Sequence, residues 1–148
     1  HRVRHEVLEG WWKDTGKLQP LLEGNRLILE TLEQHIEGSV DASSIIDGRV
    51  VIEQGAQIIN STVRGPAIIG ERTRVVNSYI GPFTSVYFDC EITDSEIEHS
   101  VILEESTVAG ISRLSDSLIG KQVVVRRSET RPIANRLMIG DHSVVDLA

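Results

Sequence analysis

The residues best suited to chemistry lie in one short segment, Gly10 to Lys17 (GWWKDTGK). This segment holds a single carboxylate, Asp14, between Lys13 and Lys17. The two lysines could contact a phosphate group, although exposure to solvent is the usual state of a lysine. Asp14 is also a residue type that caps helices, and an apolar stretch with helical spacing begins near Leu18. From residue types alone, helix capping is therefore the simplest role for Asp14.

Two tryptophans, Trp11 and Trp12, are adjacent in the same segment. On an extended backbone, neighbouring side chains point to opposite sides. One of them could line a substrate-binding cleft while the other packs in a core or an interface. Trp12, together with Lys17, is the candidate for substrate contact.

The histidines and the cysteine do not form a recognisable site in the sequence. A catalytic zinc ion needs three protein ligands around one metal. His35, His99 and His142 are too far apart along the chain to predict such a site. Cys90 is the only cysteine, which excludes an intrachain disulfide. It lies where small side chains recur, so we expect it to be buried in a core.

The composition argues against two kinds of partner. The chain has 148 residues, with 15 Lys and Arg against 22 Asp and Glu, for a formal net charge of −7. Nucleic-acid binding needs a basic face that neutralises phosphates, which this charge does not favour. No apolar run approaches the roughly 18 residues that span a membrane. We therefore expect a cytoplasmic protein that binds neither nucleic acid nor membrane.

The first 38 residues have the pattern of a strand, a loop and a helix. The segment from Val3 to Glu9 alternates in the manner of a short strand. Leucines and isoleucines then follow helical spacing from Leu18 to Ile36, and Gly38 is a natural stop. Because the period changes after this point, residues 1–38 and 39–148 are assigned to two units.

A different period begins at about Val40 and runs to about Val125. Ten aliphatic residues follow one another at intervals of five or six: Ile46, Ile52, Ile58, Val63, Ile69, Val75, Ile80, Val86, Ile92 and Ile97. Three successive intervals span 17 residues, and so regular a period indicates a repeat architecture. Each unit is one short extended segment and a bend, with one aliphatic side chain pointing inward.

The repeat predicts a left-handed parallel β-helix of hexapeptide-like units. Three segments close one turn, and successive turns stack by parallel backbone hydrogen bonds about 4.8 Å apart. Stacking should align the Asn60-Ser61, Asn77-Ser78 and Asp94-Ser95 pairs in a ladder along one edge. A β-sandwich would instead show alternating hydrophobicity with variable loops. The expected fold is mainly β, a single-stranded coil preceded by one strand and one helix.

The repeat is irregular after Ile97. Asp116-Ser117 follows Asp94-Ser95 by 22 residues, which predicts a five-residue insertion that bulges out at Ala109–Arg113. Beyond the coil, residues 139–144 (IGDHSV) look like one more step. Because the terminal repeat of a solenoid must cover its open end, we expect this step to act as a cap.

The segment before the coil resembles a known family. Gly10–Lys17, followed by residues 21–26 (LLEGNR), is similar to the closing motif of the nucleotidyltransferase domain in glucose-1-phosphate thymidylyltransferases. The tail from Pro132 to Ser143 resembles the end of the long form of these enzymes, which carries a C-terminal β-helix. The resemblance covers essentially the whole chain and implies that residues 1–38 are the end of a catalytic domain.

The resemblance implies a reaction in which glucose 1-phosphate attacks the α-phosphate of dTTP, giving dTDP-glucose and pyrophosphate. In this family, the aspartate of the Trp-x-Asp-Thr-Gly motif is one of two carboxylates that bind the catalytic Mg²⁺, and Asp14 matches it. The family's glycine-rich nucleotide loop, its other metal aspartate and its sugar-phosphate lysine and arginine have no counterpart here. We therefore expect the C-terminal portion of a longer enzyme, inactive without its N-terminal catalytic domain.

Two other functions stay open. Acyltransferases with hexapeptide coils use a coil histidine as general base, and His99 is the candidate, although the sequence identifies no partner carboxylate for it. The coil could also be purely structural. We expect a homo-oligomer, because the apolar helix face of Leu21, Ile28, Leu29 and Leu32 needs a partner when most of its domain is missing.

Overall fold

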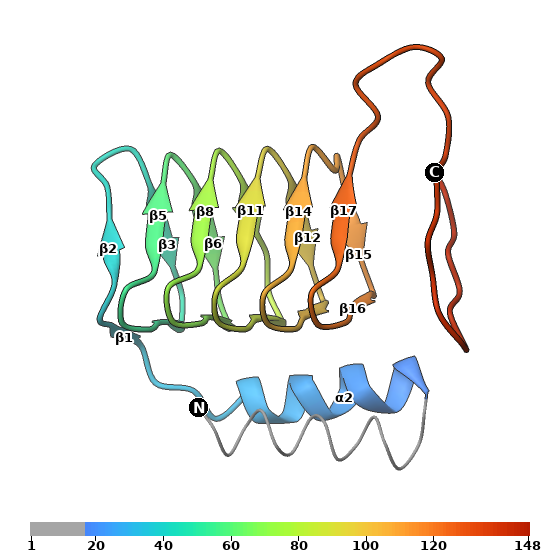
Figure 1. The fold of residues 1–148 in the computed structure, drawn as a ribbon. Coiled ribbons are helices and arrows are strands. Elements are labelled where there is room, and N and C mark those ends of the chain that lie inside the picture. Colours follow the sequence, from blue (N-terminus) through green and yellow to red (C-terminus); the bar gives the residue numbers. More distant parts are fainter. Residues whose placement is uncertain (1–16) are drawn as a thin grey trace.

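The computed structural model describes residues 17–148, which form a three-sided coil of parallel strands with a helix along one side (Figure 1). Each strand pairs in parallel with the equivalent strand of the next turn. The fold predicted from the repeat, a left-handed parallel β-helix, is confirmed, with about 5 turns. The predicted strand at Val3–Glu9 lies outside the described residues.

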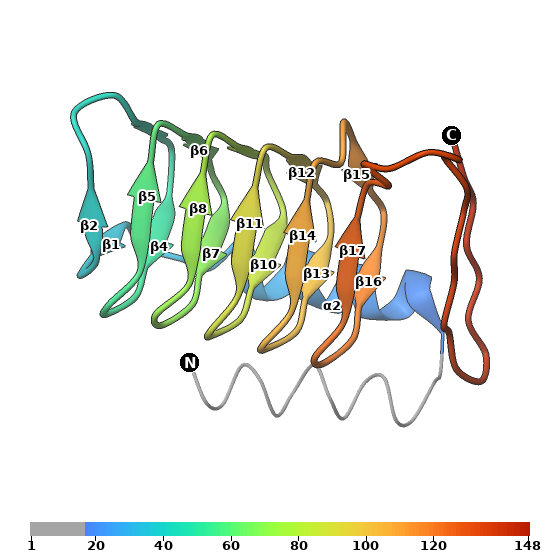
Figure 2. The same ribbon diagram turned by 45° about the horizontal axis from the view of Figure 1, so that its top comes forward.

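The three sides of the coil are three parallel sheets, which successive strands visit in the order A, B, C (Figure 2). Sheet A holds β1 (His35–Ile36), β4 (Val50–Ile52), β7 (Ala67–Ile69), β10 (Thr84–Val86), β13 (Val101–Ile102) and β16 (Leu118–Ile119). Sheet B holds β2 (Ser39–Val40), β5 (Gln57–Ile59), β8 (Arg74–Val76), β11 (Glu91–Thr93), β14 (Thr107–Ala109) and β17 (Val124–Arg126). Sheet C holds β3 (Ile45–Asp47), β6 (Thr62–Arg64), β9 (Tyr79–Ile80), β12 (Glu96–Glu98) and β15 (Leu114–Ser115).

The core of the coil is a column of aliphatic side chains. Every predicted inward residue from Ile52 to Ile97 is at most 1% exposed. Ile46 is only half-buried, because β3 is the first strand of sheet C and has a neighbour on one side alone. The predicted inward positions are therefore confirmed.

The predicted serine ladder is also present. The backbone N–H of Ser78 donates to the Ser61 hydroxyl at 3.0 Å, and that of Ser95 donates to the Ser78 hydroxyl at 3.1 Å. Asn60 and Asn77, which precede two of these serines, have φ values of 46° and 50°. Asparagine enters this left-handed region at lower cost than most side chains, which explains its place at the corner.

The predicted five-residue insertion at Ala109–Arg113 is wrong. Ile97 in β12 pairs with Leu114 in β15, which places Asp116 one turn above His99. Asp116 therefore continues the corner at His99, not the corner of the serine ladder. The spacing between paired residues falls from 17 to 16 between β12 and β13 and returns to 17 between β14 and β15, so each of these two corners changes by one residue. A corner tolerates such a shift because the strands on either side keep their ladder hydrogen bonds.

Helix α2 (Leu18–Leu29) covers sheet A and is shorter than predicted. Its Leu21 and Leu22 are at most 2% exposed, in one cluster with Tyr87 and Val101 of the coil. The helix face thus finds a partner in the coil itself, and the homo-oligomer expected from this face stays a prediction. Ile36 is not helical but lies in β1, whose backbone pairs with β4. The division into units 1–38 and 39–148 stays a prediction. Strand β1, which lies before residue 39, is already part of sheet A of the coil.

A buried polar contact fixes the helix on the sheet. Asn25 is 1% exposed; its side-chain oxygen accepts from the Ser85 hydroxyl at 2.6 Å, and its amide donates to the Phe83 carbonyl at 3.2 Å. Both polar groups of the amide are satisfied, so its burial is compatible with a stable interface.

The tail after β17 does not pair with the coil. Residues 127–148 hold no strand, and Ile139 and Val144 are 56% and 86% exposed. The predicted cap at residues 139–144 is therefore wrong for the single chain. No helix in the part of the chain that is described is long and apolar enough to cross a membrane.

Candidate functional site

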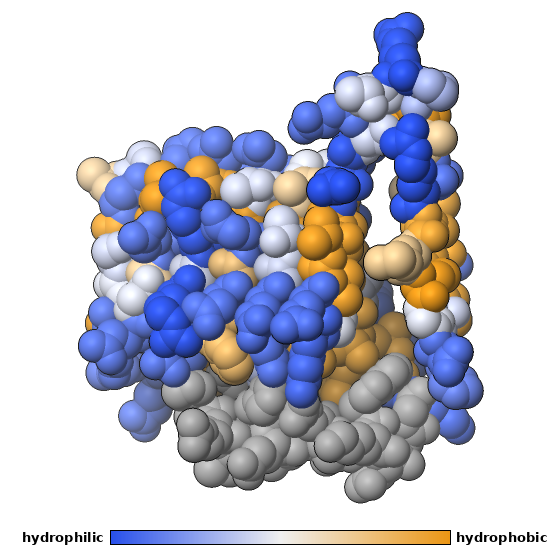
Figure 3. Space-filling view, in the orientation of Figure 1, coloured by the Kyte–Doolittle hydropathy of each residue, from blue (hydrophilic) through white to orange (hydrophobic). Residues whose placement is uncertain are grey.

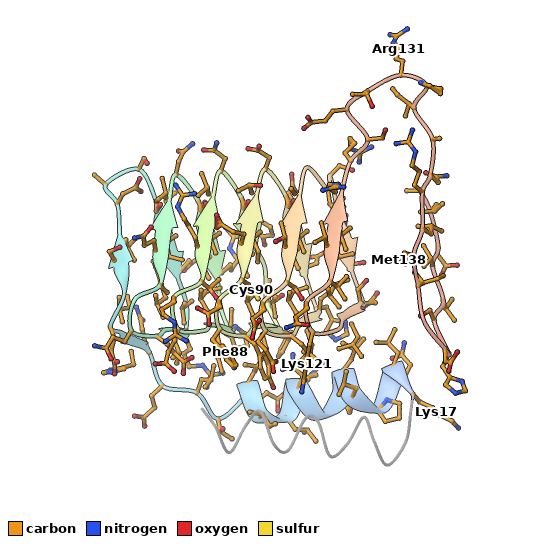
Figure 4. All side chains as sticks on the ribbon, viewed as in Figure 1. Lys17, Phe88, Cys90, Lys121, Arg131 and Met138 are labelled. Atoms are coloured by element: carbon orange, nitrogen blue, oxygen red, sulfur yellow. The ribbon has the colours of Figure 1, made fainter. Side chains whose placement is uncertain are left out.

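The residues predicted to bind substrate and metal are only partly within the structure. Lys17 is the exposed N-cap residue of α2 and makes no capping hydrogen bond (Figure 4). Trp12 and Asp14 lie outside the described residues. The N-cap position of α2 is Lys17, three residues after Asp14 in the sequence. Among residues 17–148, no group of three or more His, Cys, Asp and Glu side chains could hold a metal ion.

His99 has a carboxylate partner that the sequence did not reveal. It lies at the corner between sheets C and A, with φ of 49°, and its Nδ1 hydrogen-bonds to Asp116 on the next turn. The ring meets Phe83 edge-on at a centroid distance of 6.3 Å, and its side chain is 36% exposed. The signal that could have found Asp116 is the coil period of 17 residues, which the supposed insertion obscured.

The pair of His99 and Asp116 is a chemically capable arrangement. A carboxylate on Nδ1 selects the tautomer that leaves Nε2 free to accept a proton. Such a histidine can act as a general base when an acceptor hydroxyl reaches Nε2. Two hollows on the surface of residues 17–148 lie elsewhere and do not include His99.

The larger hollow, of about 490 Å³, follows the serine-ladder corner. Its lining includes Asn60, Asn77, Asp94 and Tyr79. The Asn60 amide donates to the Asn77 side-chain oxygen at 2.7 Å, so these two side chains are hydrogen-bonded to each other along the edge. The hollow is an open groove rather than an enclosed catalytic pocket.

The smaller hollow, of about 330 Å³, lies beside stacked ion pairs. Arg72 donates two hydrogen bonds to Asp89 on the next turn, at 2.8 and 3.0 Å. These bonds hold the pKa of the Asp89 carboxyl below its usual value. Arg74 pairs with Glu91 at 3.5 Å in the same register. The arrangement indicates a contact that orders successive turns, since each cation already has an acidic neighbour.

Cys90 is 2% exposed inside the coil (Figure 4), which confirms the prediction that it fills the core. Burial raises the pKa of its thiol to about 11. A thiol that is protonated and inaccessible at neutral pH is a poor nucleophile or metal ligand.

The described residues thus define a class of protein, a left-handed parallel β-helix of hexapeptide-like repeats. No family model matches the chain. Among solved structures, the acetyltransferase domain of PglB from Neisseria gonorrhoeae is 14% identical, with a TM-score of 0.42 over 76% of this chain and 65% of that one.

The curated relatives are more specific. The chain is 50% identical over 141 residues to a glucose-1-phosphate thymidylyltransferase from Streptomyces griseus, with 95% of this chain and 40% of the relative covered. It is 49% identical over 145 residues to that from Streptomyces antibioticus, with 98% and 41% covered. A bifunctional sugar-1-phosphate nucleotidylyltransferase/acetyltransferase from Sulfurisphaera tokodaii is 35% identical over 128 residues, with 83% and 32% covered.

The chain is homologous to the C-terminal portion of glucose-1-phosphate thymidylyltransferases, as its motifs predicted. It spans about two-fifths of the length of the Streptomyces relatives.

Proposed function

We propose that this chain is the C-terminal β-helix portion of an enzyme that makes dTDP-glucose and pyrophosphate from dTTP and glucose 1-phosphate. The observation that carries the proposal is the 50% identity to the Streptomyces griseus enzyme over 95% of the chain. The coil is proposed to orient and oligomerise catalytic domains, and the chain alone is proposed to be inactive. We place the protein in the cytoplasm, which suits its acidic composition.

Asp14 is the proposed Mg²⁺ ligand within this chain. A carboxylate oxygen is the donor that Mg²⁺ prefers, and one or two carboxylates are enough when phosphate oxygens and water complete the shell. A bound Mg²⁺ would neutralise charge on the reacting phosphates. Because two carboxylates bind the metal in the family that the motif resembles, the second is proposed to come from the N-terminal catalytic domain. Trp12 and Lys17 are proposed to contact the nucleotide or the sugar phosphate.

The test uses two proteins. The chain itself is mixed with dTTP, glucose 1-phosphate and Mg²⁺, and pyrophosphate release is measured; none is expected. A chimera that joins the N-terminal region of the Streptomyces griseus relative to this chain should release pyrophosphate. In the chimera, Asp14→Asn should lower the rate by about a hundredfold or more, because metal charge stabilisation is worth several kcal/mol. Release by the chain alone, or an unimpaired Asp14→Asn chimera, would contradict the proposal.

A second candidate function, acyl transfer, is favoured by the contact between His99 and Asp116. The carboxylate would hold the imidazole in the tautomer a general base needs. The test measures thiol release from acetyl-CoA with sugar or amino-sugar acceptors. Activity that is lost in His99→Ala and reduced in Asp116→Asn would support it. No turnover with any acceptor would leave the coil a structural element.

A further inference from the structure

The last turn of the coil and the C-terminal tail both expose apolar side chains (Figure 3). In β17, Val124 is 57% exposed, and Ile119 of β16 is half-buried. In the tail, Met138 is fully exposed (Figure 4), and Ile139 and Val144 are 56% and 86% exposed. One chain therefore presents two apolar surfaces to water.

The tail repeats the last step of the coil. Residues 118–125 are LIGKQVVV, and residues 138–145 are MIGDHSVV. Gln122, at the corner of the coil step, has φ of 56°, and His142 has φ of 62°. The tail step thus already has the bend of a coil corner. Ile139 and Val145 match Ile119 and Val125, which are the inward positions of the last turn.

Charges support the same alignment. A shift of 20 residues that aligns the two steps also sets Asp141 over Lys121 and Asp146 over Arg126. Opposite charges on neighbouring strands stabilise a sheet. The stacked arginine–aspartate pair beside the smaller hollow shows that successive turns of this coil already use such contacts.

After β17, the chain does not form the further turn of the coil that would place residues 138–146 on their own coil. Each earlier turn has an aliphatic residue on sheet C five or six residues after the inward residue of sheet B. After Val125, those positions are Thr130 and Arg131, and Pro132 follows. An inward arginine would bury an unpaired charge, and a proline cannot donate to the ladder. Within the described residues, no part of the tail joins a sheet of its own coil (Figure 1).

We infer that two copies of this chain exchange tails, with residues 138–146 of each copy stacking on β16 and β17 of the other. The exchange forms a closed, two-fold interface in which the same surfaces of both copies are used. It packs Ile139 and Val145 against the inward Ile119 and Val125 and covers the open end of each coil. The inference deepens the oligomerisation part of the proposed function. Its tests measure assembly and not nucleotide transfer, so the two can fail separately.

A disulfide can test the register and the partner together. Stacked residues lie about 4.8 Å apart, within the Cα separation that a disulfide spans. Gln122→Cys with His142→Cys, in a Cys90→Ser background, should give a disulfide-linked dimer on a non-reducing gel after mild oxidation. The control pair, Gln122→Cys with Ile133→Cys, should not. A disulfide within one chain would assign the step to its own coil, and no disulfide would refute the stacking; either result overturns the inference.

Substitutions test the interface without a cross-link. Sedimentation equilibrium of the intact chain should show a dimer, and Ile139→Asp should raise its dissociation constant at least about tenfold. Ile133→Asp, a matched change outside the step, should have no effect. Arg126→Asp and Asp146→Arg should each weaken the dimer about two- to fivefold, and the double variant should restore it. A chain that is monomeric at micromolar concentration, or a charge swap without restoration, would overturn the inference.

Discussion

Truncation of an isoleucine in the core should destabilise the coil by an amount that depends on how many turns cover it. Ile80 in β9 is fully buried between Val63 on the turn below and Ile97 on the turn above. Ile46 has the equivalent position in the first turn, where it is half-buried with a neighbouring turn on one side only. Ile80→Ala and Ile46→Ala therefore compare one chemical change in two packing environments.

The magnitude follows from the buried carbon atoms. Removing three carbons from Ile80 loses about 2.4 kcal/mol of transfer free energy. The cavity adds to this loss, because hydrogen-bonded turns on both sides hold the backbone in place, so we expect a total of about 3–4 kcal/mol. For Ile46 we expect about 1–2 kcal/mol, because part of its side chain is already exposed and the open turn can relax.

Urea unfolding followed by circular dichroism measures both losses as changes in the free energy of unfolding. The slopes against urea must agree between variants, because a repeat protein can unfold in parts. Losses that are equal in the two variants to within about 0.5 kcal/mol would refute the reasoning. The number of neighbouring turns would then have no effect on the free energy lost.

Three single positions offer further tests. A Cβ on Gly70 would lie 2.5 Å from the Tyr87 carbonyl carbon, whereas one on Gly120 would meet nothing closer than 3.7 Å. Gly70→Ala should therefore destabilise by about 1–3 kcal/mol in thermal unfolding and Gly120→Ala should not, and equal effects would contradict the close approach. Asn77 has φ of 50°, so Asn77→Ala should be about 1 kcal/mol less stable in urea than Asn77→Gly, with no difference as the contrary result. Burial raises the pKa of the Cys90 thiol to about 11 from 9.0, so its contribution to stability is complete below pH 9 and is lost as the pH rises toward 11. Cys90→Ala should flatten stability over this range, and an unchanged pH profile would contradict the assignment.

The core of the coil was predictable from the sequence because its pattern is local. An inward aliphatic recurs every five or six residues, and each such residue from Ile52 to Ile97 is buried. The serine ladder was predictable for the same reason, since equal spacing along the chain becomes vertical alignment once the turns stack. The resemblance of the Gly10–Lys17 motif likewise pointed to the relatives that were found.

The contact between His99 and Asp116 follows the 17-residue period of the coil, but the sequence analysis aligned Asp116 with a different corner. The Asp-Ser pair at residues 116–117 repeats the residue types of Asp94-Ser95, yet it lies at the corner of His99, five residues further along the turn, and this offset looks like an insertion. The end of α2 escaped prediction in a similar way, because Ile36 fits a helical period as well as the strand it forms. In both cases the competing arrangements have similar local energies, and backbone pairing with a neighbouring turn decides between them.

The sequence by itself determined the repeat, the inward side chains and the family, because each depends on residue type and spacing along the chain. Only the tertiary structure decided which corners stack, where the helix packs and that the tail step stays off its own coil. These outcomes depend on contacts between residues distant in sequence, such as Asn25 with Ser85, and on the absence of an inward aliphatic after Val125. A linear pattern states which side chains are available for burial, whereas the stacked turns select the partners that bury them.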